Sequence, residues 1–350
     1  MSEKLAILAE GLWAQSDAKT GHGVLRFGGE REVVCVVDST QAGRSSAEVV
    51  PFARRDVPIV ADVDAAHALG ATCALIGVAP AGGKLTDAWK AQLLRAMELG
   101  MDVEAGLHTL LNDDPALVEA AATHGVQLRD LRTSPKGLTI PRADLSRKAG
   151  VRVVHTVGTD CAIGKMSTAL ELTEGACARG RNAVFVATGQ TGIAITGWGI
   201  AVDHVISDYV NGAAESLIDQ GSERGDLLFL EGQGSLLHPG YSAVTQGLLH
   251  GSQPDVLVLQ HLAGQTHNDD YPSRPIPPLS DVIALYELSA SAVRPARVAA
   301  IALNTKHLDD AGAAQAIAEA EAETGLVADD VVRNGPGRVL DAVLSAVDAL

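Results

Sequence analysis

The sequence predicts an α/β protein of two domains, each built on a parallel sheet, and three observations support this. Short apolar segments alternate with helix-like segments along the chain, which is the pattern of doubly wound sheets. The composition is 47% hydrophobic but only 3% aromatic, so the core consists mainly of aliphatic side chains, as in parallel sheets covered by helices. A length of 350 residues suits two ordinary domains.

The first half of the chain holds one series of alternating segments. Apolar runs predict strands over 5–9, 33–37, 58–61, 73–78, 102–105 and 126–131. Helical patterns fall between them, over 65–69, 86–99 and 115–123. No GxGxxG motif follows the first strand, so dinucleotide binding is not supported.

The second half repeats the alternation after a change of composition. Residues 133–148 are polar and basic with two prolines, which is typical of a crossing between domains, and we expect domains over 1–145 and 146–350. Strands are predicted over 151–157, 183–188, 227–230, 256–260 and 298–303. Helices are predicted over 207–220, 243–249, 281–290, 311–324 and 337–349. The acidic side chains of Glu319, Glu321 and Glu323 indicate one solvated helix face.

The segment 151–172 reads as a strand, a glycine-rich loop and a helix, and it predicts a phosphate site. Gly158 and Gly164 permit backbone dihedrals that let consecutive N–H groups converge on an anion. The following helix N-terminus adds partial positive charge, and Lys165 adds a full one. The predicted cofactor-binding loop comprises Gly158, Thr159, Asp160, Cys161, Ala162, Ile163, Gly164, Lys165, Met166 and Ser167.

This loop departs from the standard Walker pattern in two ways. Five residues separate the two glycines where the standard pattern has four, and Met166 stands where Ser or Thr should hold the metal ion. Ser167 and Thr168 come one and two places late. The longer spacing resembles the GTD-x-x-x-GK loop of dethiobiotin synthetase and its relatives. The alternative to a phosphate site is a glycine-rich strand-to-helix turn with a surface lysine. Even if the loop binds phosphate, ATP hydrolysis does not follow.

Four loops of the first half are expected at the carboxyl edge of its sheet, where ligands bind in open α/β folds. Asp38 either holds a ribose hydroxyl or caps a turn. Gly82 and Gly83 either form an anion nest or a simple turn. The loops span residues 19–23, 38–44, 77–84 and 106–108.

Polar residues follow the strands of the second half, and their convergence beside the phosphate loop is the strongest sign of a site. Glu231, at the end of an apolar strand, is a candidate for holding a metal ion or a water, or for a structural cap. Asp203 precedes a predicted helix, whereas Asp208 either caps that helix or acts in the site. His238 and His261 are either structural or proton shuttles.

Bulk properties exclude several classes of function. A net charge of −16 argues against nonspecific binding to nucleic acid or to anionic membranes. The four cysteines are scattered and indicate neither a zinc site nor a disulfide framework. There is no apolar run of 18 residues and no cleavage-site pattern, so we expect a soluble cytoplasmic protein. A homo-oligomer is plausible because most soluble oligomers are symmetric assemblies of one chain.

Several strings together resemble one P-loop family, long catalogued only as a domain of unknown function. In the second half they are GTDCAIGKMST, ATGQTGIAITGWGIAVDHVISDYVNGAAE, EGQGSLLHPGYSAVTQGLLHG and PPLSDVIALYE; in the first half they are AKTGHGVLRF and GVAPAGGKLTDAW. The EGQGS string is also similar to the EGAGG segment of dethiobiotin synthetase. The resemblance covers nearly the whole chain and implies a Rossmann-like N-terminal domain and a C-terminal domain of P-loop NTPase type.

The resemblance also implies an activity, because the family includes a bacterial D-glutamate N-acetyltransferase that uses acetyl-CoA. We expect transfer of an acetyl group to the amine of D-glutamate or a similar D-amino acid. The alternative is an ATP-dependent carboxylate-activating enzyme like dethiobiotin synthetase, with Mg²⁺ near Glu231 and Asp203; a third is a nucleotide- or CoA-binding regulator without turnover. The catalytic candidates are Lys165, Asp203, Glu231 and His238. The substrate-binding candidates are Arg44, Gln190, Thr191, Asp208, Gln233, Arg274 and Lys306.

Overall fold

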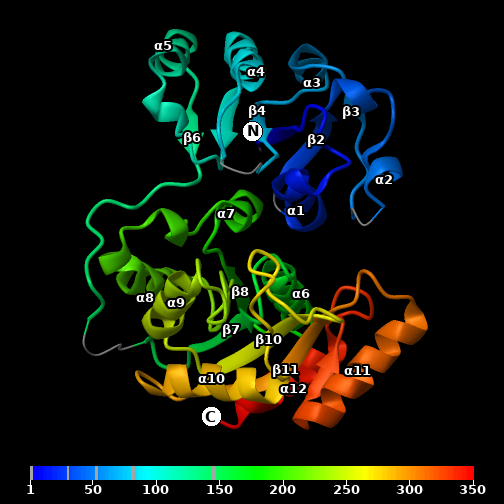
Figure 1. The fold of residues 1–350 in the computed structure, drawn as a ribbon. Helices are drawn as coiled ribbons and strands as arrows, with labels where there is room; N and C mark the ends of the chain where they lie inside the picture. The colour runs from blue at the N-terminus through cyan, green and yellow to red at the C-terminus, as the bar shows by residue number, and fades with distance from the viewer. Residues whose placement is uncertain (1–2, 30, 52–53, 80–82, 143–146) are drawn as a thin grey trace. The chain divides into compact units, whose positions relative to one another are not determined.

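The computed structural model describes residues 3–29, 31–51, 54–79, 83–142 and 147–350. These residues form two compact units (Figure 1). Each unit consists of two separate stretches of the chain, whereas the sequence predicted one continuous stretch for each. The N-terminal unit comprises Met1–Ser134 and Gly189–His204, and the P-loop unit comprises Pro135–Thr188 and Val205–Leu350. The expected boundary at residue 145 lies outside the described residues.

The N-terminal unit is built on a six-stranded parallel sheet, as predicted. Its order is β3-β2-β1-β4-β5-β6, so the first strand is central and the connections wind outward in both directions. Residues Leu5–Leu8 are fully buried, which explains the continuous apolar run. The strands are β1 (Lys4–Leu8), β2 (Glu32–Val37), β3 (Ile59–Val60), β4 (Cys73–Ile76), β5 (Asp102–Ala105) and β6 (Leu128–Asp130).

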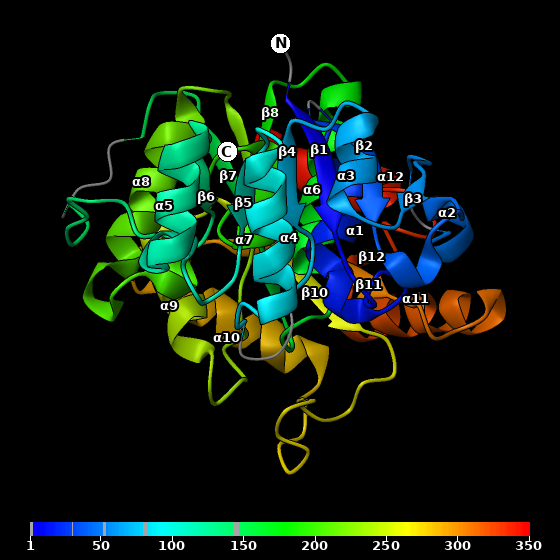
Figure 2. The same cartoon turned by 90° about the horizontal axis from the view of Figure 1, so that it is seen from above.

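Helices cover both faces of this sheet, with α3, α4 and α5 on one face and α1 and α7 on the other (Figure 1). The turned view shows α4 and α5 side by side over β4, β5 and β6 (Figure 2). The α-helices are α1 (Lys19–Phe27), α2 (Ser46–Val49), α3 (Val63–Ala68), α4 (Asp87–Glu98), α5 (Pro115–His124) and α7 (Gln190–Thr196). The 3₁₀ helices are η1 (Ser16–Ala18), η2 (Ser39–Gln41), η3 (Leu111–Asp113) and η4 (Val202–His204).

One segment expected to be a loop begins a helix instead, and a second helix was not predicted at all. Residues 19–23 open α1, and Gln190 opens α7. The glycines that suggested a loop serve close packing: a Cβ on Gly21 would lie 2.7 Å from Ile7 Cγ2. The side chain of Thr191 bonds that of Thr20 at 2.9 Å, which joins α7 to α1. The glycines at 21 and 23 predicted a turn, because the sequence does not show that Ile7 packs where a Cβ of Gly21 would lie.

The P-loop unit holds a second parallel sheet, with the order β12-β11-β10-β7-β9-β8. The strand that leads into the glycine-rich loop, β7, is therefore central and pairs with β9 and β10. The predicted strands are confirmed with small shifts of their ends, and β12 is an addition. The strands are β7 (Arg152–Gly158), β8 (Ala183–Val186), β9 (Leu227–Leu230), β10 (Val256–Leu262), β11 (Arg297–Asn304) and β12 (Val327–Asp329).

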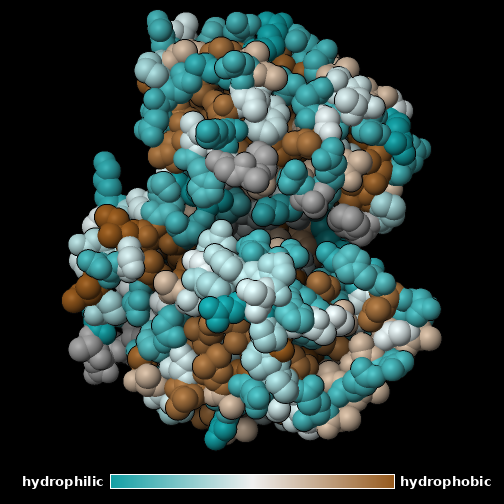
Figure 3. All heavy atoms as spheres, in the orientation of Figure 1, coloured by the Kyte–Doolittle hydropathy of each residue, from teal (hydrophilic) through white to brown (hydrophobic). Residues whose placement is uncertain are grey.

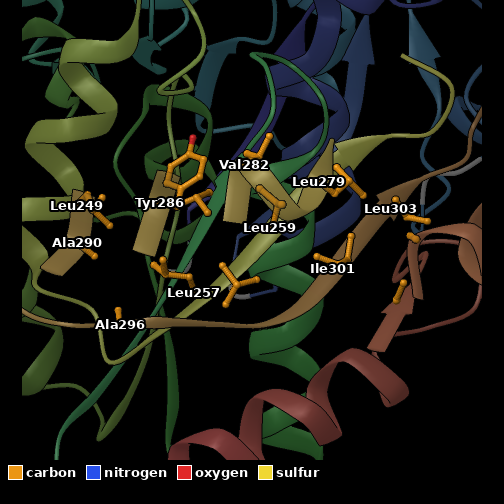
Figure 4. Packing of buried hydrophobic residues seen from close by; sticks show 14 residues of the cluster. Leu249, Leu257, Leu259, Leu279, Val282, Tyr286, Ala290, Ala296, Ile301 and Leu303 are labelled. Atoms are coloured by element: carbon orange, nitrogen blue, oxygen red, sulfur yellow. The ribbon is translucent and has the colours of Figure 1, made fainter. Parts of the chain in front are cut away.

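The helices of this unit bury an aliphatic core against the sheet. One cluster joins Leu257 and Leu259 of β10 to Tyr286 of α10 (Figure 4). Hydrophilic side chains gather over α11, where Glu319 accepts a bond from Gln315 at 2.8 Å (Figure 3). The helices are α6 (Lys165–Ala178), α8 (Val210–Ser222), α9 (Ser242–Ser252), α10 (Leu279–Ser291), α11 (Asp310–Thr324), α12 (Gly337–Asp348) and the 3₁₀ helix η5 (Ser207–Tyr209).

Two further properties concern the described part of the chain as a whole. None of its helices combines the length and the apolar character needed to span a bilayer. The four cysteines are free thiols; Cys35 and Cys73 are buried, and Cys177 is exposed.

Candidate functional site

The glycine-rich loop connects the end of β7 to the start of α6. Ala162 has φ +53° and Gly164 has φ +117°, so two of its residues adopt the left-handed region. For Ala162 this conformation costs about 1 kcal/mol, which the surrounding bonds must offset. Such backbone reversals turn consecutive N–H groups toward one point, as an anion cradle requires.

The N-terminus of α6 is open to a ligand. Within the described residues no side chain caps it, and the first helical bond runs from Thr168 N to Gly164 O. The backbone N–H groups of Lys165, Met166 and Ser167 precede that bond and lack an intrahelical acceptor. These donors and the helix dipole favour an anion at this point.

Lys165 is buried, and its ammonium folds back onto the loop. Its Nζ donates to Asp160 O at 2.6 Å. Burial lowers the pKa of Lys165 to about 8, although the charges of Cys161, Asp160 and Glu231 oppose the shift. A buried ammonium with a single carbonyl acceptor gains most from an anionic ligand.

Asp160 is a structural anchor, because both of its carboxylate oxygens are occupied within the unit. The donors to Oδ1 are Cys161 N at 2.7 Å and Asn268 Nδ2 at 2.5 Å. Those to Oδ2 are Gln265 Nε2 at 2.6 Å and Asp269 N at 2.8 Å. The carboxylate thus ties the segment after β10 to the glycine-rich loop.

Two residues of β10, Gln260 and His261, form hydrogen bonds with the glycine-rich loop and the start of α6. Gln260 accepts a bond from Thr168 Oγ1 at 2.5 Å and donates to Ile163 O at 3.3 Å. His261 Nδ1 lies 2.9 Å from Thr159 Oγ1, and burial lowers the pKa of His261 to about 4. A ring that is neutral near pH 7 and bonded to the loop favours the structural alternative for His261.

A second brace comes from α10. Tyr286 rises from the apolar cluster with its hydroxyl pointing away from it (Figure 4). That hydroxyl donates to Gly158 O at 2.7 Å and accepts from Leu236 N at 3.1 Å. It therefore fixes the start of the phosphate loop relative to the loop that follows β9.

Glu231 lies at the end of β9, buried beside Lys165. Its Oε2 accepts a bond from Thr188 N at 2.9 Å, and its own carbonyl accepts one from Thr188 Oγ1. Gln233 donates to Thr188 O at 2.6 Å, which closes the ends of β8 and β9 together. Gly232 must be glycine, since a Cβ there would lie 1.7 Å from Thr156 O.

His238 is buried next to the phosphate loop in a defined tautomer. Its Nδ1 accepts bonds from Gly240 N and Tyr241 N, both at 3.1 Å, so the proton resides on Nε2. Nε2 lies 3.1 Å from the carboxylate of Asp270. In this arrangement the ring is a hydrogen-bond donor and has no lone pair left to accept a proton.

Asp160, Cys161 and His238 bring potential metal ligands within 4.8 Å of one another. Their bonding does not suit a metal ion, because Asp160 accepts bonds from four donors and His238 presents one N–H and one occupied lone pair. Burial also raises the pKa of Cys161 to about 11, which keeps it a thiol. The hydroxyl that usually holds Mg²⁺ is replaced by Met166, and that of Thr168 is bonded to Gln260. We therefore derive no step through a metal ion.

A pocket of about 320 Å³ adjoins this region within the P-loop unit. His261, which is bonded to Thr159 of the glycine-rich loop, also lines this pocket. Glu319 and Glu323 are its acidic lining residues. Its other lining residues are mostly apolar, among them Ile276, Leu279 and Leu303. The lining suits a ring or an alkyl chain better than a phosphate group.

The remaining candidates lie elsewhere. Asp203 belongs to the N-terminal unit, where it pairs with Arg132. Asp208 is exposed, and no side-chain cap is present at η5 or α8, so the capping alternative for Asp208 is wrong. Arg44 is half-exposed and bonded to Gln41 and Glu48.

Asp38 and the remaining substrate-binding candidates occupy different parts of the two units. Asp38 caps η2 and accepts bonds from Gly11 N, Trp13 N and Thr40, which supports the cap rather than a ribose contact. Gln190 and Thr191 lie in the N-terminal unit on α7. Arg274 and Lys306 are exposed in the P-loop unit, which leaves their proposed role untested. The nest at residues 82–83 falls partly outside the described residues.

Sequence reasoning missed Gln260, Asp270, Tyr286 and Arg132 as parts of polar networks. Tyr286 sits in an ordinary helical pattern, and only its fully buried hydroxyl distinguishes it from a core aromatic residue. Arg132 lies between the strand predicted over 126–131 and the linker predicted over 133–148. No signal along the chain links Arg132 to Asp203.

Comparisons with known proteins agree with this architecture. A profile described as "Domain of unknown function (DUF1611_C) P-loop domain" matches residues 142–340, and one described as "Domain of unknown function (DUF1611_N) Rossmann-like domain" matches 39–134. A crystal structure of a DUF1611 family protein from Anabaena variabilis is 44% identical with a TM-score of 0.91, covering 98% of this chain and all of that one.

Two curated relatives carry a functional name. A protein of Tritonibacter scottomollicae named D-glutamate N-acetyltransferase is 42% identical over 284 residues, which is 80% of this chain and 84% of the relative. A protein of Pseudoalteromonas sp. with the same name is 38% identical over 239 residues, 68% of this chain and 70% of the relative. With its Rossmann-like N-terminal domain and its C-terminal P-loop domain, this chain therefore belongs to the DUF1611 family.

Proposed function

We propose that this protein transfers an acetyl group from acetyl-CoA to the amine of D-glutamate or a similar D-amino acid. The observation that carries the proposal is the 42% identity, over 80% of this chain, to a protein named D-glutamate N-acetyltransferase. The site adds a phosphate loop in which Met166 replaces the usual metal-binding hydroxyl. Such a loop suits a cofactor that is held through its phosphates and is not hydrolysed there.

Coenzyme A carries a pyrophosphate and a 3′-phosphate, and the phosphate loop offers donors for one of them. We assign that phosphate to the free N–H groups at the start of α6 and to the ammonium of Lys165. In the complex Lys165 exchanges its bond to Asp160 O for a charge-assisted bond to phosphate. The neighbouring apolar pocket is a candidate for the ring or alkyl parts of the cofactor.

The chemistry requires one proton acceptor and one group that stabilises developing negative charge. The amine loses a proton as its nitrogen bonds to the thioester carbon, and collapse of the tetrahedral intermediate breaks the C–S bond and releases the CoA thiolate, which is then protonated. Glu231 is our candidate for the base, because it is buried beside Lys165. His238 is assigned the donor role: its single proton is held on Nε2, and in the complex this N–H exchanges its contact with the Asp270 carboxylate for the developing oxyanion.

An ATP-dependent carboxylate-activating enzyme is the second candidate. The position of Glu231 at the end of β9, beside the phosphate loop, favours it, as does the likeness of the loop to that of dethiobiotin synthetase. In that reaction the loop would hold ATP.

One experiment separates these functions. Purified protein is incubated with D-glutamate and acetyl-CoA without ATP, and free thiol and N-acetylglutamate are measured. We expect equimolar release of both products, with D-glutamate preferred over L-glutamate. Turnover that requires ATP and Mg²⁺ would defeat the transferase, and tight CoA binding without turnover would indicate a regulator.

A further inference from the structure

The N-terminal unit contains a polar cluster that the proposed chemistry leaves unused. Arg132 follows β6, and its side chain is only 7% exposed. Its Nε donates to Gly106 O at 3.2 Å, and its Nη1 pairs with the carboxylate of Asp203. His108 lies near enough to Arg132 and to His204 to interact with both electrostatically. We call Gly106, His108, Arg132, Asp203 and His204 the Arg132 cluster.

The cluster stands where a Rossmann-like sheet binds ligands. Gly106 and His108 follow β5, Arg132 follows β6, and these parallel strands end at the same edge. Hydrogen bonds through the backbone of two members hold the cluster in place. His108 N donates to Gly83 O at 2.9 Å, and His204 O accepts a bond from Ser134 Oγ at 2.7 Å.

Arg132 differs from Arg31, a partly buried arginine of the same unit, in how its donors are used. Arg31 bonds both oxygens of Glu104, a carboxylate oxygen of Glu3 and Ala194 O. Arg132 has one carboxylate and one carbonyl, and within the described residues its Nη2 has no partner. A largely desolvated guanidinium with an unused donor is suited to a second anionic acceptor.

The local charges indicate which kind of anion fits. Asp203 already balances the charge of the guanidinium, and burial, with smaller contributions from Arg132 and His204, lowers the pKa of His108, so that ring is neutral near pH 7. A dianionic phosphate would leave excess negative charge beside Asp203. A singly charged carboxylate can accept one bond from Nη2 and another from an imidazole N–H.

We propose that the Arg132 cluster binds a carboxylate group of the acceptor amino acid. The proposal rests on the proposed transferase function, which supplies an amino diacid as the acceptor. It makes Arg132 a substrate-binding residue and Asp203 a positioning residue that holds the guanidinium.

The test uses the full-length chain and two matched arginine variants. Arg132→Met removes the buried guanidinium, whereas Arg95→Met removes a surface guanidinium of the same unit that also pairs with an aspartate, Asp64. We expect Arg132→Met to raise the KM for D-glutamate roughly 10- to 100-fold, because a charged hydrogen bond is lost. The KM for acetyl-CoA should stay constant, Arg95→Met should change neither, and Arg132→Lys should restore part of the affinity.

A binding measurement keeps the proposal testable if a variant is unstable or inactive. Glutarate, a dicarboxylate without an amine, is titrated calorimetrically into wild type, Arg132→Met and the milder variant His108→Ala. Weaker glutarate binding in the variants supports the site. An unchanged affinity in both, or an Arg132→Met enzyme with an unchanged KM for D-glutamate, would overturn it. If wild type binds glutarate through Arg132 but does not acetylate D-glutamate, only the proposed function fails.

Discussion

The two sheets share a parallel six-stranded design, yet their central strands end in different ways. In the N-terminal unit, helix α1 packs against the central strand β1 at Gly21, and Asp38 consumes the nearby backbone N–H groups of Gly11 and Trp13. In the P-loop unit, β7 runs into a loop whose amides are left for a ligand, beside a buried lysine. The fold therefore places the carboxyl edge of each sheet, whereas the hydrogen-bond partners at that edge decide whether it can bind a ligand.

The two units also use buried cations differently. Lys165 bonds a single carbonyl and sits within reach of three groups that bear or can bear negative charge. Arg132 pairs with Asp203 and retains one donor. A compact ammonium suits a phosphate as a point charge, and a planar guanidinium suits a carboxylate. Substitutions at these cations and at their neighbouring carboxylates should therefore affect different kinetic constants.

The sharpest contrast is between two carboxylates, one in each unit. Glu231→Gln removes the proposed base, so kcat should fall by about 10²- to 10⁴-fold. The KM for acetyl-CoA should change little. Asp203→Asn should leave kcat nearly constant and raise the KM for D-glutamate. Steady-state kinetics on both variants measure this, and the reverse pattern would return the base to Asp203.

Removal of the P-loop cation should act on cofactor binding alone. Lys165→Ala should weaken CoA binding roughly 30- to 150-fold, the effect of losing a charge-assisted hydrogen bond. Lys148→Ala, which removes an exposed lysine of the same unit, is the control. Calorimetric titration with CoA gives both constants. Equal affinities would mean that Lys165 does not contact the cofactor.

Asp38, at the edge of the N-terminal sheet, should contribute to stability and not to ligand binding. Asp38→Ala leaves the backbone N–H groups of Gly11, Trp13 and Thr40 without their acceptor. We expect a loss of about 2 kcal/mol in the free energy of unfolding. Urea denaturation measures that loss. CoA affinity should remain that of wild type under native conditions; a large change in affinity at normal stability would contradict the structural role.

The pH dependence of CoA binding should follow Lys165. Its pKa is lowered to about 8 in the free protein, and a bound phosphate keeps the ammonium charged. The apparent Kd should therefore rise about tenfold between pH 7 and pH 9, and the rise should vanish in Lys165→Ala. Lys165 affects folding in the opposite direction. The unfolded chain holds this proton up to the ordinary lysine pKa of 10.5, so the free energy of unfolding increases as pH rises from 8 toward 10.5. A flat binding profile in wild type would contradict the assignment.

Much of the fold was predictable because strands and helices follow from the hydrophobic pattern of residues that are neighbours in the chain. Continuous apolar runs predicted strands such as β9, and helical periodicity predicted α4 and α11. The helices α1 and α7 were missed, because glycine next to polar residues reads locally as a turn. What stabilises them as helices is close packing, at Gly21 against Ile7 and between Thr20 and Thr191, and such contacts leave no trace in periodicity.

The candidate site divides in the same way. The loop from Gly158 to Lys165 was predicted from spacing, because glycines and a lysine between a strand and a helix have few other uses. The carboxylate of Glu231 was also found from its place at a strand end. The tautomer of His238 and the bond from Tyr286 to Gly158 depend on residues far away in the chain, so no spacing rule could supply them.

By itself the sequence determined two parallel α/β sheets, the phosphate loop and the family, since each depends on residues that are neighbours in the chain. Tertiary structure decided that Gly189–His204 belongs to the N-terminal unit, that Asp203 pairs with Arg132, and that Asp160 is an anchor. The physical reason is that backbone geometry and burial pattern are local properties. The partner of a charged side chain is instead chosen by whichever donor or acceptor the folded chain brings within about 3 Å.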